Sequence, residues 1–228
     1  MSAKTFAVIL VTGLLLTVTG LSAPVFGPLP VDNPTFETLP PGGFTNTTDI
    51  DGPYSAGEMI PGWTTPPGNA GQFQPAPGIF NPGQLPTPII AWSGSPGSTI
   101  SQTVANTVED DVIYTLMVDL GFRNPSQGVV PAFTASADLL VGGPGGIIVP
   151  ATGTAPASGD WSTFTAVFRP SAADIGKTIT IQLNSSGNQA VFADVQLAAV
   201  PEPGDAGLAG LGLAGLLALA LAKRVRRT

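Results

Sequence analysis

The sequence predicts an all-β domain, a jelly-roll β-sandwich of about 8–10 strands. Three observations carry this prediction. Apolar and polar residues alternate with a period of two in several short stretches, which is typical of half-buried strands. Glycine, proline and serine separate these stretches at short intervals, as turns do. Between the two hydrophobic ends of the chain, no long stretch has the spacing of an amphipathic helix.

The clearest alternation lies in Val112–Arg123, where every second residue from Val112 to Leu120 is apolar. One face of this strand is therefore expected to be buried. Residues Ser171–Lys177 are expected to form a single helical turn before the next strand. The other strong strand candidates are Trp161–Arg169, Thr178–Leu183 and Ala190–Leu197. The shorter candidates are Thr35–Thr38, Glu58–Trp63, Ile89–Trp92, Thr99–Val104, Phe133–Val141 and Ile147–Val149.

A proline- and glycine-rich segment at about residues 38–88 interrupts this pattern. Twelve of the 24 prolines lie between Thr38 and Ile100. Proline has no backbone N–H to donate to a sheet, so this segment is expected to be mostly loop with edge strands at most. It is either ordered in patches around its aromatic residues or a mobile surface flap. The aromatic residues in question are Tyr54, Trp63, Phe73 and Phe80.

Missing residue types and the charge balance exclude several function classes. The chain has no histidine and no cysteine, which excludes Ser-His-Asp and Cys-His catalysis, the usual zinc sites and disulfides. Residues 24–203 carry 3 basic and 14 acidic side chains, a net charge of −11 (3 minus 14). This negative charge disfavours nucleic acid as a binding partner, because its phosphates are also negative. A carboxylate pair is the catalytic scheme left open, but no spacing singles one out. We expect a non-enzymatic protein, with an extracellular glycoside hydrolase as the alternative.

The N-terminus has the features of a secretory signal peptide. Lys4 precedes the apolar stretch Phe6–Val18, and small residues follow it up to Ala23. We expect residues 1–23 to be this signal and residues 24–199 to form one exported domain. A retained N-terminal membrane anchor is the alternative, and it also places the domain outside the inner membrane.

The C-terminus, residues 200–228, carries three elements in order. Pro201-Glu202-Pro203 precedes an apolar run at residues 206–222, and a basic end at residues 223–228 follows. A helix of that length lies at the short end of what spans a bilayer. Basic residues at a helix end remain on the cytoplasmic side, so they fix its orientation. The residues with this orienting role are Lys223, Arg224, Arg226 and Arg227.

This tail resembles the PEP-CTERM sorting signals of Gram-negative bacteria. The resemblance implies an exosortase, a membrane transpeptidase, as partner, with processing near Pro201-Glu202-Pro203. It further implies transient anchoring in the inner membrane, then release to the outer surface or extracellular matrix of bacteria that make exopolysaccharide.

A second set of short motifs marks the two ends of the domain. Asn33-Pro34-Thr35-Phe36-Glu37 opens it, and Phe192-Ala193-Asp194-Val195-Gln196-Leu197 closes it. They resemble galactose-binding-like jelly rolls, which include many carbohydrate-binding modules. In that family, matching acidic residues hold a structural calcium ion, which implies Glu37 and Asp194 as ligands. Alternatively, Glu37 is solvated and Asp194 is satisfied by backbone donors.

Sugar binding requires exposed aromatic rings beside polar groups. Trp92 ends a strand at a Ser-Gly turn, and Tyr54 lies in an expected loop, so these two are the candidate ligand-binding residues. Trp63 and Trp161 are expected in the core. The sequence therefore predicts a sorted, cell-surface or matrix protein with a carbohydrate-binding role.

Overall fold

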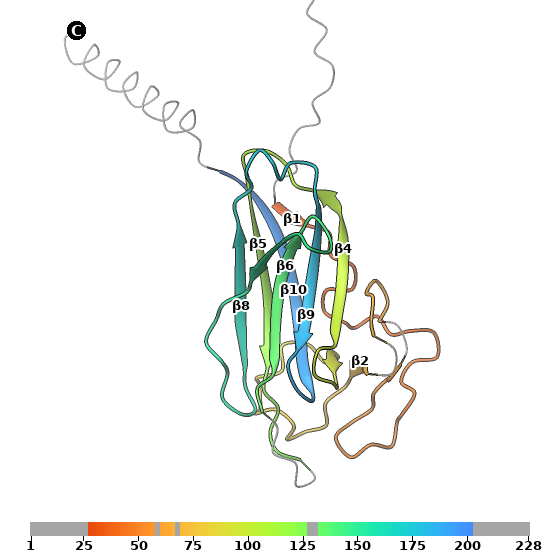
Figure 1. The fold of residues 1–228 in the computed structure, drawn as a ribbon. Coiled ribbons are helices and arrows are strands. Elements are labelled where there is room, and N and C mark those ends of the chain that lie inside the picture. The colour runs from red at the N-terminus through yellow and green to blue at the C-terminus, as the bar shows by residue number, and fades with distance from the viewer. Residues whose placement is uncertain (1–26, 58–59, 67–68, 127–131, 203–228) are drawn as a thin grey trace, which may run out of the picture.

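The structure is a computed structural model that describes residues 27–57, 60–66, 69–126 and 132–202. The expected signal peptide, the apolar run 206–222 and the basic end 223–228 lie outside these residues. Two antiparallel sheets pack face to face (Figure 1). Their strands are β1 (Gly27–Leu29), β2 (Ala70–Phe73), β3 (Ile90–Ser93), β4 (Thr99–Thr107), β5 (Val112–Gly121), β6 (Ala135–Val141), β7 (Ile147–Pro150), β8 (Trp161–Phe168), β9 (Thr178–Ser185) and β10 (Ala190–Pro201).

The strand order is that of a jelly roll. One sheet has the order β2-β3-β10-β5-β8, with β1 also paired to β10, and the other has the order β4-β9-β6-β7. Strands β3 to β10 thus pair first with last: β3 with β10, β4 with β9, β5 with β8 and β6 with β7. Such nested pairing arises when one long antiparallel ribbon rolls into two sheets. The predicted all-β sandwich is confirmed.

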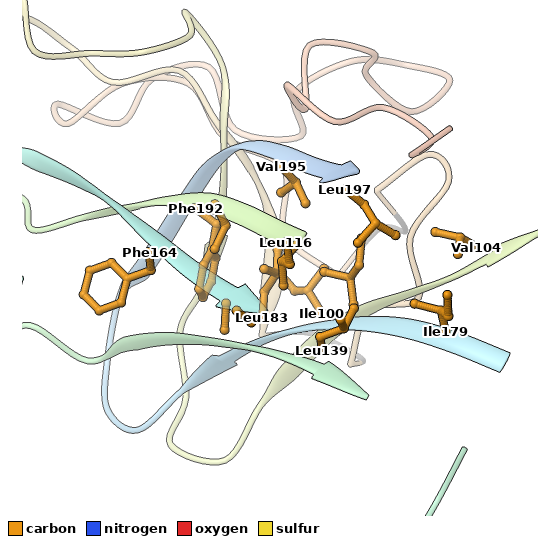
Figure 2. Packing of buried hydrophobic residues seen from close by; sticks show 14 of the residues in the cluster. Ile100, Val104, Leu116, Leu139, Phe164, Ile179, Leu183, Phe192, Val195 and Leu197 are labelled. Atoms are coloured by element: carbon orange, nitrogen blue, oxygen red, sulfur yellow. The ribbon is translucent and has the colours of Figure 1, made fainter. Parts of the chain in front are cut away.

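The main core lies between the two sheets. In β5, alternate residues from Val112 to Leu120 are buried, as the period of two predicts. Figure 2 shows Leu116 and Phe192 of the six-stranded sheet facing Leu139 of the four-stranded sheet. Burying one such side chain stabilises the fold by about 1.5–3 kcal/mol. The sandwich is therefore held mainly by apolar contacts between its layers.

The segment expected as a strand at Thr35–Thr38 is a turn instead. The Phe36 N–H donates to the carbonyl of Asn33 (3.2 Å), and both residues have positive φ, 61° and 46°. This left-handed backbone directs Phe36 into the core, where its ring lies 5.3 Å from that of Trp63. The strand prediction was wrong because one buried residue in a short segment fits a turn as well as a strand.

Two other local expectations also fail. The described part of the expected strand 58–63, Ile60–Trp63, is a turn closed by a 2.9 Å bond from the Trp63 N–H to the Ile60 carbonyl. Residues Ser171–Lys177 form two successive turns without a helix, with bonds from Asp174 to Ser171 and from Lys177 to Asp174. The eight other expected strands are present as β3 to β10.

The proline-rich segment packs on the sandwich through its aromatic residues. Trp63, Phe73 and Phe80 are buried, in agreement with the prediction of ordered patches. Phe73 and Phe80 join Ile90 and Val191 in a second apolar cluster, separate from the core between the sheets. In Figure 1 this orange-to-yellow segment gathers beside β2 at one end of the sandwich. It supplies several of the residues that line a pocket on the outer face of the six-stranded sheet.

The last strand continues beyond the expected domain boundary at residue 199. Pro201 still pairs with Val112 of β5, and the Glu202 N–H donates to the Asp111 carbonyl (2.7 Å). The first residues of the expected sorting motif are therefore attached directly to the sandwich. Among the residues that the structure describes, none forms a helix long and apolar enough to cross a membrane.

Candidate ligand-binding site

A pocket of about 230 Å³ opens on the outer face of the six-stranded sheet. Its position follows from strand register. Gly71, Trp92, Val191, Gly121 and Trp161 lie in one row across β2, β3, β10, β5 and β8. The adjacent row contains Phe192 and Leu120 of the main core, so this row faces outward. The pocket is lined by Asp49, Asp51, Tyr54, Phe73, Trp92, Arg123, Gln189 and Val191.

The two candidate ligand-binding aromatics, Tyr54 and Trp92, meet in this pocket. Their ring centroids lie 6.0 Å apart with an interplanar angle of 89°, an edge-to-face arrangement. The Trp92 indole N–H donates to the Ser55 carbonyl (3.1 Å), and the Asn46 amide donates to the Tyr54 hydroxyl (3.0 Å). Both rings are half-buried. Their orientation is thus set by the protein before any ligand arrives.

An ion pair forms the floor beside these rings. The Arg123 guanidinium donates to Asp51, whose carboxylate also accepts from the Ser126 hydroxyl. The guanidinium lies 5.9 Å from the centroid of the Phe73 ring, a cation–π contact. The side chains of Arg123 and Asp51 are only 9% and 14% exposed. Arg123 therefore neutralises Asp51 within the protein.

Asp49 adds a second carboxylate to the pocket. Its Oδ1 accepts the N–H of Asp51 (2.8 Å), which fixes the turn that carries both residues. The charges of Asp51 and Arg123 cancel, so the side chains that line the pocket carry a net charge of −1, which comes from Asp49. Sequence reasoning singled out neither Asp49 nor Arg123. A signal existed for Arg123, because it is one of three basic residues in residues 24–203 and follows a strongly apolar strand.

The predicted calcium ligands lie elsewhere. Asp194 sits at a β-bulge of β10 with a φ of 44°, and its Oδ2 accepts from the Gln196 amide (2.9 Å). Glu37 is exposed in the loop after Phe36 rather than on a first strand. The Val195 N–H donates to the Pro34 carbonyl (3.0 Å), so the two segments adjoin.

Within the described ranges, no group of three or more His, Cys, Asp or Glu side chains is placed to hold a metal ion. Backbone carbonyls would have to supply most ligands of a calcium ion near Asp194. The alternative prediction gave Asp194 a backbone donor. In the structure, the donor to its carboxylate is the side-chain amide of Gln196. The assignment of calcium to Glu37 and Asp194 stays a prediction.

Two carboxylates with raised pKa values face opposite sides of the sandwich. Burial raises the pKa of Asp119 on β5, and the nearby Asp194 charge adds to this, although a bond from Thr163 opposes it. Burial likewise raises the pKa of Asp138 on β6, against a bond from Asn184. Because they lie on the outer faces of two sheets about 10 Å apart, they do not form one acid–base pair.

Glu202, which belongs to the sorting motif that the sequence predicts, also has a defined contact. Its Oε1 lies 2.6 Å from Nη1 of Arg169, which follows β8. This ion pair is exposed, with 63% of the Arg169 side chain and 38% of the Glu202 side chain accessible. Pro203 and the four basic residues predicted to orient the tail lie outside the described residues.

Comparison with known proteins gives one family match. The family model described as HpiC1-like, HpiC1 cyclase, matches residues 27–198. No curated protein matches the sequence.

Solved structures similar to this fold include carbohydrate-binding modules. The CBM22-1 xylan-binding domain of Paenibacillus barcinonensis Xyn10C is 11% identical, covers 61% of this chain and 86% of its own, and has a TM-score of 0.41. A CBM4 structure is 14% identical, covers 75% and 100%, and has a TM-score of 0.41. The enzymatically active domain of bacteriophage CBA120 tailspike protein 4 is 14% identical and covers 68% and 21%, with a TM-score of 0.40.

Proposed function

The chain belongs to the HpiC1-like family, and we propose that its exported domain binds carbohydrate at the pocket of Tyr54 and Trp92 without acting as an enzyme. The observation that carries this proposal is the pair of oriented, half-buried rings. A pyranose ring stacks its apolar face on such an aromatic surface, while neighbouring polar groups bind its hydroxyls. Asp49 and Gln189 line the same pocket and provide those polar groups.

The size of the pocket favours binding one sugar unit over enclosing a whole substrate. Its volume of about 230 Å³ lies below the ~300–1,000 Å³ typical of pockets that bury most of a small molecule. An open site of this kind suits one residue of a polysaccharide chain that continues into solvent. The charges in the pocket favour binding over catalysis. Asp51 is held by Arg123 and Ser126 and is therefore not placed as a free acid or base.

Two enzymatic alternatives follow from the family description and from the carboxylates. One is a cyclase, because the family model carries that name. The other is a glycoside hydrolase that uses two carboxylates.

A glycan array with the full-length protein in detergent, followed by a reducing-end assay on each glycan bound, separates binding from hydrolysis. Binding without release supports our proposal, whereas release that is lost in Asp49→Asn would overturn its non-enzymatic part.

We further propose that the C-terminal tail is sorted and cleaved by an exosortase. The order of motif, apolar run and basic end supports this proposal. Cleavage would leave the domain at the outer surface or in an exopolysaccharide matrix, where a carbohydrate-binding site has a ligand. The C-terminal mass of protein recovered from the cell surface tests it. A chain ending near residue 203 is expected, and an intact end at Thr228 would contradict it.

The contact of Glu202 with Arg169 permits a sharper version of this test. Glu202→Ala is expected to block processing if the motif is read by the enzyme. Arg169→Ala removes the partner of Glu202 but leaves the motif intact, so processing should persist. Equal loss in both variants would assign the effect to the ion pair instead of the motif.

A further inference from the structure

We propose that the Tyr54–Trp92 pocket prefers glycans that carry protonated amino groups, such as polymers of glucosamine, over neutral or acidic glycans. The inference rests on the proposed carbohydrate-binding function and adds a ligand class to it. It depends on the distribution of charge in and around the pocket.

Within the described part of the chain, an acidic glycan at the pocket would meet no basic side chain that lacks a carboxylate partner. The three basic side chains of this part are all engaged by carboxylates: Arg123 by Asp51, Arg169 by Glu202 and Lys177 by Asp174. An acidic sugar at the pocket would lie near Asp49 and would receive no compensating charge. Repulsion of like charges therefore selects against uronic acids and sulfated sugars.

An amino group would find two complementary features in the pocket. Trp92 and Tyr54 line the pocket, and the face of an aromatic ring attracts a cation through its π electrons. Asp49, in the same lining, provides a carboxylate for a charge-assisted hydrogen bond. Arg123 does not cancel this attraction, because its charge is already matched by Asp51. Aromatic rings beside one uncompensated carboxylate therefore favour a cationic sugar over a neutral one.

The charge of the whole domain acts in the same direction. Residues 24–203 carry a net charge of −11 (3 minus 14), which attracts a polycation at long range and speeds its association. This general attraction is screened by salt, whereas contacts inside the pocket are screened less. The salt dependence of binding thus separates the two contributions.

The first experiment compares three probes with the full-length protein in detergent, in a mildly acidic buffer that keeps the amines protonated. The probes are β-1,4-linked oligomers of glucosamine, of N-acetylglucosamine and of glucuronic acid, matched in length. We expect the glucosamine oligomer to bind on the order of ten- to hundredfold more tightly than the acetylated one, with the acidic oligomer weakest. Equal or tighter binding of the acetylated oligomer would overturn the inference.

The second experiment locates the charge responsible. Asp49→Asn keeps the size of the side chain and should remove most of the preference for the amine. Asp110→Asn is the matched control, because Asp110 is exposed on the turn before β5, at the end of that strand opposite the pocket. An equal effect of both variants would mean that net charge, not the pocket, selects the ligand, and would overturn the proposal.

A third variant separates failure of this inference from failure of the proposed function. Trp92→Ala should weaken all oligomers that bind. If it does so while the amine gives no advantage, the site binds carbohydrate but the ligand class is wrong. If Trp92→Ala leaves binding of every oligomer unchanged, both the site and the inference are wrong.

Discussion

A side chain at Gly71 would collide with the backbone of Ser55. A Cβ atom built on Gly71 lies 1.9 Å from the Ser55 carbonyl oxygen and 3.1 Å from Nε1 of Trp92. The Ser55 carbonyl accepts the Trp92 indole N–H, and Tyr54 precedes Ser55 in the chain. The absence of a side chain at this position thus lets both aromatic residues of the pocket take their places.

Gly71→Ala should therefore damage the pocket directly. The methyl group must push Ser55 away from β2, which breaks the bond to Trp92 and shifts Tyr54. We expect glycan affinity to fall by at least about tenfold, with a loss of stability of about 1–3 kcal/mol from overpacking. Affinity measurements and urea unfolding check the two effects. Wild-type affinity in this variant would show that the pocket does not depend on this close approach.

The buried ion pair of Arg123 and Asp51 should contribute far more to stability than the exposed one. Arg123→Met keeps most of the apolar stem but removes the guanidinium from the largely buried Asp51, and we expect a loss of about 3–5 kcal/mol in the free energy of unfolding. Arg169→Met is the matched control. Its pair with Glu202 is exposed to solvent, so a loss of about 0–1 kcal/mol is expected. Urea unfolding of both variants tests this, and equal losses would contradict it.

Acid should destabilise the turn at residues 171–177. A bond from Lys177, with two more from Ser171, holds the pKa of Asp174 at about 2, below its ordinary value of 3.8. The unfolded chain therefore binds a proton more readily than the folded one between about pH 4 and pH 2. This contribution to stability is fully present above about pH 4 and is lost as the pH falls through about 2.

Asp174→Asn isolates that contribution. Its free energy of unfolding should depend less on pH than that of the wild type between about pH 4 and pH 2. Urea unfolding at several pH values provides the measurement. Parallel pH profiles for the two proteins would assign the acid sensitivity to other carboxylates.

Calcium is testable by thermal stability. If Glu37 and Asp194 hold a structural calcium ion, adding calcium should raise the melting temperature because the ion binds only the folded state. The rise should disappear in Asp194→Ala, whereas Asp138→Ala on the other sheet should retain it. An unchanged melting temperature in the wild type would remove calcium from the account.

The sequence predicted the parts of this molecule in which local pattern and burial agree. Alternation in Val112–Arg123 identified β5 because a half-buried strand requires that period. The fold class followed from several such strands. Trp92 and Tyr54 were identified as candidate ligand-binding residues because each lies at a strand end or in a loop, and the structure brings both into one pocket.

Other features depend on contacts between distant segments, which the pattern does not encode. Phe36 reaches the core through a left-handed turn, and Gln72 on β2 is buried because its amide bonds the carbonyls of Phe36 (2.5 Å) and Thr38 (2.8 Å). β2 itself was missed because glycine and glutamine interrupt its apolar residues. Asp51 and Arg123 lie 72 positions apart, so their pairing could not be inferred from spacing.

The affinity of Trp92→Ala for the glycan that binds best decides whether carbohydrate binds at the Tyr54–Trp92 pocket. Isothermal titration of the full-length protein would compare it with the wild type and with Trp161→Phe, which alters an aromatic residue in the same outward row but outside the pocket lining. We predict a loss of at least roughly tenfold for Trp92→Ala and little change for Trp161→Phe, with urea unfolding confirming that both variants are folded. Wild-type affinity in folded Trp92→Ala would contradict the account.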